Sequence, residues 1–259
     1  MIRLQGVRYD AQSSYLRGAA DAPPLIRAAL HSDSANYWSE SGLDLQHVFD
    51  DAGDITPTVY EEIRSGVAAG EQTIFLGGDH SITYPLVQAI HERFGPVEIL
   101  HFDAHPDLYD VFEGNRFSHA CPFARIMEEG LAVRLTQVGI RTAHGHQREQ
   151  ARRFGVDMIE MKDFTDAWRP SFRGDVPVYV SFDIAVLDPA CAPGVSHWEP
   201  GGMTTRQALR VIQSITAPVV AADIVECNPA VEAKMTAMTA AKILKELAAV
   251  MISNPKKGA

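Results

Sequence analysis

Cysteine is scarce in this sequence, and long apolar runs are absent from it. The three cysteines, Cys121, Cys191 and Cys227, show no Cys-x-x-Cys spacing, which argues against a disulfide framework or a thiolate metal cluster. No apolar stretch reaches the ~20 residues of a membrane helix, and the first residues lack the apolar region of a signal peptide. We therefore expect a cytoplasmic protein with reduced thiols and no membrane contact.

Basic residues are also few relative to acidic ones. The chain has 23 Lys and Arg against 33 Asp and Glu, which gives a formal net charge of −10. Nucleic-acid binding requires a basic surface, so nucleic acids are not expected partners, whereas bound cations would neutralise part of the acidity. No linker rich in Pro, Gly or Ser and no internal repeat divides the 259 residues. A single domain over residues 1–259 is expected.

Apolar runs alternate with helical patterns along most of the chain. This alternation predicts an α/β fold of three layers, α/β/α, around a central and mostly parallel sheet. The expected strands are Arg3–Val7, Leu43–Val48, Thr73–Leu76, Val97–Phe102, Arg134–Gly139, Met158–Glu160, Val176–Asp183 and Val219–Ile224. The expected helices are Pro23–Leu30, Pro57–Ala69, Ile82–Phe94, Pro122–Glu129, His146–Phe154, Thr205–Ile215 and Val231–Ile252.

Metal-type ligands follow the end of the expected strand Val97–Phe102. Asp103, His105 and Asp107 are spaced two residues apart. Asp103 and His105 start on the same side because strand side chains alternate, and Pro106 breaks the strand so that Asp107 folds back toward them. Two carboxylates and an imidazole suit Mn²⁺, Fe²⁺ or Zn²⁺. The alternative is a charged loop in which His105 is solvated or capping.

Two further strand ends bear acidic or histidine side chains. Leu76–Ser81 closes the run Gln72–Phe75, and Val178–Asp183 is an apolar run that ends in a carboxylate. In open α/β sheets, ligands bind at the carboxyl ends of the strands. The three strand ends together therefore favour a metal site over three unrelated loops.

These motifs resemble the signature blocks of the ureohydrolases, the arginase/agmatinase family of binuclear manganese enzymes. The similarity runs in register from about residue 70 to about residue 245. It implies eight parallel strands between helices and a homo-oligomer, either a trimer or a hexamer. The matching blocks are Gly77–Ser81, Asp103–Asp107, Ser181–Asp183 with Leu187–Pro189 and Ala192–Gly194, and Asp223–Pro229.

The resemblance implies a ligand set for two Mn²⁺ ions. Asp103 and Asp183 are similar to the carboxylates that bridge the two ions. His80 and Asp107 are similar to the remaining ligands of the first ion, and His105 to a ligand of the second. Two ions that share a water lower its pKa toward hydroxide, and a guanidinium needs so strong a nucleophile because it is a poor electrophile.

The resemblance also implies roles for residues that touch the substrate. Glu226 is similar to the glutamate that holds the guanidinium in a charge-assisted pair. His119 is similar to a histidine that shuttles protons or contacts the substrate, so Asp107 or His119 is expected to deliver the proton to the leaving amine. His197 is a candidate for the pocket mouth, with a loop or interface role as the alternative.

The sequence departs from the family pattern at Ala185. The family has Asp-x-Asp where this chain has Asp183-Ile184-Ala185, and Asp188 belongs to a segment that the family also has. The second ion therefore lacks its terminal carboxylate, and we expect it to bind weakly. Two explanations stand: an engineered inactivating change, which the otherwise intact site favours, or a natural chain that uses one metal or has lost catalysis.

The predicted function is manganese-dependent hydrolysis of a small guanidino compound to urea and an amine, impaired by Ala185. Leu108–Val111 and Arg141–His146 lack the arginase residues that hold the amino-acid end of arginine, which favours agmatine as the substrate. One alternative is a non-catalytic or single-metal protein that binds a ligand or assembles with active subunits. A second alternative is an arginase or a guanidino-acid hydrolase.

Overall fold

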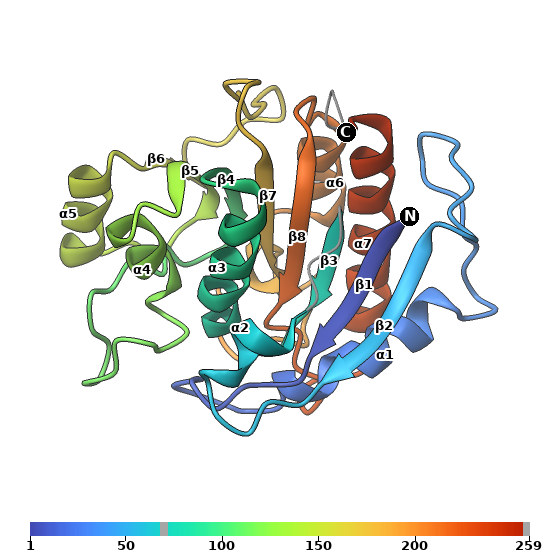
Figure 1. Cartoon of the computed structure of the whole chain (residues 1–259), viewed down its shortest axis with the longest axis horizontal. Helices are drawn as coiled ribbons and strands as arrows, with labels where there is room; N and C mark the ends of the chain where they lie inside the picture. Colours follow the sequence, from blue (N-terminus) through green and yellow to red (C-terminus); the bar gives the residue numbers. More distant parts are fainter. Residues whose placement is uncertain (68–71, 256–259) are drawn as a thin grey trace.

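A central parallel sheet organises the structure, a computed structural model that describes residues 1–67 and 72–255 (Figure 1). Within these ranges the sheet has eight strands in the order β2-β1-β3-β8-β7-β4-β5-β6, and their pairings are parallel. The predicted parallel eight-stranded sheet is therefore confirmed. The strands are β1 (Ile2–Val7), β2 (Phe49–Ile55), β3 (Thr73–Leu76), β4 (Val97–Phe102), β5 (Ala132–Ile140), β6 (Asp157–Glu160), β7 (Val178–Asp183) and β8 (Val219–Val225).

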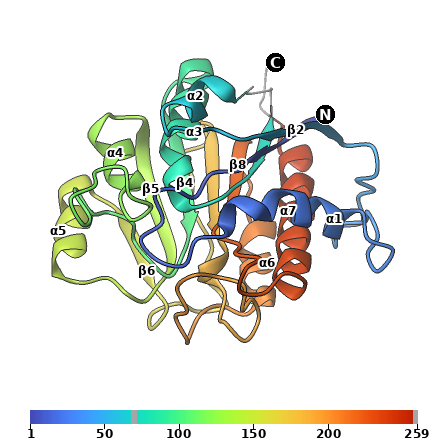
Figure 2. The ribbon, with the colours of Figure 1, turned by 90° about the horizontal axis from the view of Figure 1, so that it is seen from below.

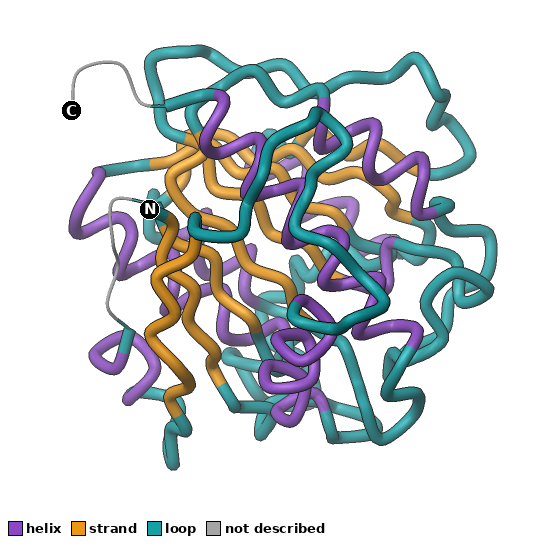
Figure 3. The backbone as a smooth tube through the Cα atoms, turned by 90° about the vertical axis from the view of Figure 1, so that its right-hand side faces the viewer, coloured by secondary structure: helices purple, strands orange, loops and turns teal. Residues whose placement is uncertain are grey.

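Helices cover both faces of the sheet, as Figure 2 shows from below and Figure 3 from the side. One face packs against α2, α3 and α4, and the other against α1, α6 and α7. The predicted three-layer fold is thus confirmed. The helices are α1 (Ala22–Leu30), α2 (Glu62–Gly66), α3 (Thr83–Phe94), α4 (Pro122–Glu128), α5 (Gly145–Phe154), α6 (Thr205–Gln213) and α7 (Met235–Ser253).

Two apolar cores lie on opposite sides of the sheet. Phe75 and Phe123 belong to the core under α3 and α4, whereas Phe102 and Leu244 belong to the core under α1, α6 and α7. Strands β4, β7 and β8 are buried along their whole length, which explains why their sequences are apolar on both faces. Burying a large apolar side chain such as Phe75 or Phe102 contributes roughly 1.5–3 kcal/mol. Within the described residues, no helix is long and apolar enough to cross a membrane.

One predicted strand is wrong, and one predicted helix is shorter than expected. Leu43–Val48 is not a strand; β2 begins one residue later, at Phe49, and forms an exposed edge of the sheet whose polar sequence gives no apolar signal. The apolar residue Leu45 of the predicted segment instead lies in a loop and is buried in the apolar core. The predicted helix Pro57–Ala69 is reduced to α2, and its residues 68 and 69 lie outside the described residues. Every other predicted strand overlaps an observed one.

The four central strands β3, β8, β7 and β4 are neighbours in the sheet. Because the strands are parallel, their carboxyl ends meet at one edge, which lies at the bottom of Figure 1. The segments that follow them contain the metal-type residues predicted from the sequence. The topology therefore brings four stretches that are far apart in the chain to one place.

Candidate active site

A cluster of buried carboxylates surrounds the imidazole of His80. His80 begins a short 3-10 helix (His80–Ile82) after β3, Asp103 and Asp107 follow β4, and Asp183 ends β7. The Nδ1 atom of His80 lies 3.3 Å from Asp103 Oδ2, 3.0 Å from Asp107 Oδ2 and 3.1 Å from Asp183 Oδ2. One nitrogen and three carboxylate oxygens thus converge on a single point.

A hydrogen-bond relay determines which ring nitrogen of His80 faces the carboxylates without a proton. The Ser181 hydroxyl donates to Asp223 Oδ1 over 2.7 Å, so it accepts from His80 Nε2, which is 3.0 Å away. The neutral ring therefore has its proton on Nε2 and a lone pair on Nδ1. Within the described residues Nδ1 is buried and has no hydrogen-bond partner.

Three carboxylates that converge on one nitrogen favour added positive charge between them. Although burial opposes a charged ring, hydrogen bonds to these carboxylates raise the pKa of His80 well above its usual value. Burial, together with the nearby charge of Asp103, raises the pKa of Asp183 to about 8, which shows how unfavourable the uncompensated carboxylates are. A divalent cation supplies that charge, and a nitrogen-plus-carboxylate donor set suits Mn²⁺, Fe²⁺ or Zn²⁺. The residues present therefore fit the first Mn²⁺ ion that the sequence predicted.

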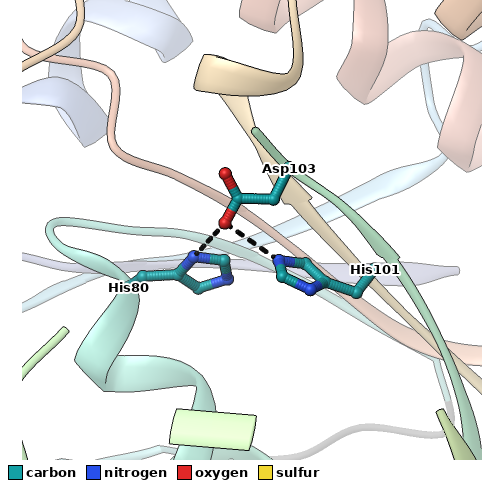
Figure 4. A group of neighbouring side chains, drawn as sticks. All are labelled: His80, His101 and Asp103. Atoms are coloured by element: carbon teal, nitrogen blue, oxygen red, sulfur yellow. Dashed lines mark hydrogen bonds and ion pairs between the residues drawn. The ribbon is translucent and has the colours of Figure 1, made fainter. Parts of the chain in front are cut away.

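His101 fixes the orientation of Asp103, as Figure 4 shows. The side chain of Gln137 donates to His101 Nδ1 over 3.0 Å, so His101 Nε2 donates to Asp103 Oδ2 over 3.1 Å. Burial lowers the pKa of His101 and keeps the ring neutral, and the ring stacks on Phe123 at 3.9 Å between centroids. Although His80, His101 and Asp103 form a compact group of potential ligands, His101 holds Asp103 rather than a metal ion.

The side of the cluster near His105 has fewer ligands. The backbone amide of His105 donates to Asp103 Oδ1 over 2.9 Å, and its Nδ1 atom lies 3.3 Å from the same oxygen. Ala185 lines the pocket here, and its amide donates to Asp183 Oδ1 over 2.6 Å. A methyl group therefore occupies the place of the expected carboxylate, so the residues present fit the second ion only in part.

His119 and Glu226 form a buried pair beside the cluster. His119 Nδ1 lies 2.8 Å from Glu226 Oε1, which also accepts the backbone amide of His80 over 2.9 Å. Burial disfavours the charged imidazole, but the Glu226 carboxylate outweighs this effect and raises the pKa of His119 to about 9. Glu226 has a positive φ of 62°, as does Asp107 at 49°. Such strain costs of order 1–3 kcal/mol and clusters at functional sites.

A pocket of about 170 Å³ opens onto this cluster. The imidazole of His197 lines it, with ring centroids 5.4 Å from His119 and 5.8 Å from His105. The structure thus brings all of the predicted site residues together, and it places His197 in the pocket wall. The rest of the wall presents hydroxyl, amide and aromatic groups from Ser14, Tyr109, Phe112, Thr142, Gln147 and Ser196.

The sequence analysis missed several residues that support the site. His101 and Ser181 each lie two residues before a ligand, and Asp223 lies three residues before Glu226. A polar residue inside an otherwise apolar strand, two positions before a ligand, is the signal that would have found the first two. Ser14 belongs to the loop after β1, and its hydroxyl contacts His119 Nε2 at 2.8 Å. No local sequence pattern predicts that contact.

The fold and the arrangement of the site are those of the ureohydrolase family. The chain belongs to the arginase family, whose family model matches residues 1–249. It is 46% identical to "Arginase 1, mitochondrial" of Arabidopsis thaliana, over 95% of this chain and 80% of that protein. It is 33% identical to "Agmatinase, mitochondrial" of Gallus gallus, over 95% of this chain and 79% of that protein. The solved arginase from Medicago truncatula aligns with a TM-score of 0.86 and 42% identity, covering 96% of this chain and 87% of that one.

Proposed function

We propose that this protein hydrolyses a small guanidino compound to urea and an amine, with L-arginine as its first expected substrate. The observation that supports this proposal is the position of the His119–Glu226 pair beside the His80 cluster, within one pocket. A buried carboxylate binds a guanidinium, and the adjacent metal ligands provide for activation of water. The reaction adds one water to the guanidinium carbon and releases the substrate's amine.

Sequence similarity favours arginine as the substrate, whereas the sequence analysis had favoured agmatine. The plant arginase is more similar to this chain than the avian agmatinase is. Hydroxyl and amide groups of Ser14, Thr142 and Gln147 line the pocket and offer hydrogen bonds to an amino-acid end. We propose that these neutral groups serve in place of the residues whose absence had argued against arginine.

The residues of the site have separate roles in the reaction. His80, Asp103, Asp107 and Asp183 would hold one Mn²⁺, and when bound such an ion lowers the pKa of water. Glu226 binds and orients the guanidinium. The raised pKa of His119, about 9, makes the ring an imidazolium at neutral pH, with Nδ1 against Glu226 Oε1. His119 gives one proton to the departing amine and becomes a neutral imidazole. The side chains of His119 and Glu226 are both buried, which strengthens the hydrogen bond between them.

The test is urea release in buffer supplemented with Mn²⁺. Arginine, agmatine, guanidinobutyrate and guanidinopropionate are compared for the chain and for its Ala185→Asp variant, with Glu226→Gln in that variant as the control with weakened substrate binding. The proposal expects urea from the chain itself and at least about tenfold more from the Ala185→Asp protein, with arginine giving the highest kcat/KM. Absence of urea from all four compounds, with metal bound, would refute hydrolysis. A higher kcat/KM for agmatine would refute the arginine assignment alone.

Ala185 supports one alternative function, a single-metal or non-catalytic member that binds a guanidino ligand. The methyl group at this position leaves the His105 side without a terminal carboxylate. This alternative expects arginine to bind the chain without releasing urea, with turnover appearing only in Ala185→Asp. Calorimetry with arginine, run beside the urea assay, separates the two functions.

Assembly and location stay predictions. The chain is expected to form a trimer or hexamer in the cytoplasm, without nucleic-acid partners. Size-exclusion chromatography with light scattering tests the oligomer, and imaging of the tagged full-length chain tests the location.

A further inference from the structure

A half-buried arginine, Arg141, connects two loops of the active site. Arg141 follows β5, and its guanidinium donates to the main-chain oxygen of Glu199 over 2.9 Å and 2.6 Å. The same guanidinium donates to the main-chain oxygen of Ala185 over 2.8 Å. The backbone at Glu199 is therefore fixed relative to the loop that bears the missing metal ligand.

The side chain of Glu199 reaches from this fixed point toward His105. Its Oε1 atom lies 3.8 Å from His105 Nε2, while the other ring nitrogen, Nδ1, faces Asp103 Oδ1 at 3.3 Å. His105 thus stands between two carboxylates that contact opposite ends of its ring. The Glu199 side chain is 39% exposed, so it is free to rotate by the small amount that closes 3.8 Å to a hydrogen bond.

We propose that Glu199 is the positioning residue of His105, accepting the Nε2 proton so that Nδ1 stays deprotonated and directed at the second metal ion. Histidines that bind metals nearly always donate their other ring N–H to such a partner, which fixes the tautomer and strengthens the ligand. The inference rests on the two-ion site of the proposed function. With alanine at position 185, Glu199 also contributes negative charge on the side of the site where a carboxylate is missing.

The experiment measures Mn²⁺ binding rather than turnover. Full-length Ala185→Asp protein serves as the parent, because its second ion is expected to bind tightly enough to measure. Glu199→Ala and Glu199→Gln are added to it, and Glu92→Ala is the matched control, since Glu92 is an exposed carboxylate on α3 that pairs with Arg64. Electron paramagnetic resonance of free Mn²⁺ during a titration gives the number of bound ions and both dissociation constants.

Glu199→Ala is expected to raise the dissociation constant of the second ion about 10- to 100-fold, the usual effect of losing such a partner. The first ion should change less than about twofold. Glu199→Gln should recover part of the loss, since its amide oxygen accepts the same proton, and Glu92→Ala should match the parent.

Four results would overturn the inference: an unchanged second ion in Glu199→Ala, equal weakening of both ions, equal weakening by Glu92→Ala, or a parent that binds one ion at saturation. If the parent binds two ions but releases no urea, the proposed function fails while the titration still decides the role of Glu199.

Discussion

Restoring a carboxylate at position 185 is the most direct test of how the site works. The backbone there is already held in place, since the Ala185 amide donates to Asp183 Oδ1 over 2.6 Å and its carbonyl accepts from Arg141 over 2.8 Å. The side chain is 4% exposed and lines the pocket. Ala185→Asp therefore adds a carboxylate to a prepared position without requiring the loop to move.

The magnitude follows from what that carboxylate would bind. Loss of a hydrogen-bond partner behind a metal ligand costs about 10- to 100-fold in affinity or activity, and a charged ligand should matter no less. We expect Ala185→Asp to raise urea formation at least about tenfold. The metal-free variant should be less stable, because a further carboxylate is buried near Asp103 and Asp183, and Mn²⁺ should raise its Tm more than that of the parent.

The assay is colorimetric urea release from arginine across a range of Mn²⁺ concentrations, with metal content measured on the same samples. Ala185→Asn is the matched control, because it has nearly the shape of aspartate but no charge. Equal rates for alanine and aspartate at this position, with two ions bound in both proteins, would refute the importance assigned to the missing ligand.

Three further predictions follow from the structure. After dialysis against low Mn²⁺, metal analysis of the chain should find close to one tightly held ion per subunit; two retained ions would mean that a replacement ligand was overlooked. In the Ala185→Asp protein, Glu226→Gln should lower kcat/KM roughly 10- to 150-fold, from a charge-assisted bond of about 1.5–3 kcal/mol, with unchanged metal content; loss of metal would place Glu226 among the ligands. Hydrogen bonds from Arg148 lower the pKa of Glu160 from 4.5 to about 2, so their stabilisation is complete above about pH 5 and is lost as the pH falls toward 2. Glu160→Gln should therefore show a smaller drop in Tm between pH 6 and pH 3, and an identical drop would contradict this.

The fold was predictable because its central strands have continuous apolar sequences. Thr73–Leu76 and Val97–Phe102 are apolar on both faces, and their observed bounds coincide with the predicted ones. The edge strand β2 was missed because half-exposed and exposed residues form all of it, so burial imposes no pattern on its sequence. Helix α2 begins at Glu62, which accepts hydrogen bonds from the amide and hydroxyl of Thr58, and it ends at Gly66; glycine is a poor helix former.

Residues that lie near strand ends were identified from the sequence, and residues that act through the sheet were not. Asp103, Asp183 and Glu226 were identified from motifs that directly end or follow an apolar run. The contact between Ser14 and His119 joins positions 105 residues apart. It depends on the close approach of the β1 loop to Gly78, where a Cβ atom would lie 1.7 Å from the Tyr9 carbonyl oxygen. Only the assembled fold shows such a contact.

The supporting residues form a row across the sheet. Gln137 on β5, His101 on β4, Ser181 on β7 and Asp223 on β8 are direct partners in the strand register. A buried polar group costs free energy unless it is hydrogen-bonded, and each member of the row makes at least one hydrogen bond, as Gln137 does to His101 and Ser181 to Asp223. Asp223 also accepts the hydroxyls of Tyr179 and Thr83. This row lies in register beneath the ligands and holds both the ring of His80 and the carboxylate of Asp103. A shift of β4 or β7 would break its hydrogen bonds to the neighbouring strands. The sheet thus positions the metal ligands through its interior as well as through its ends.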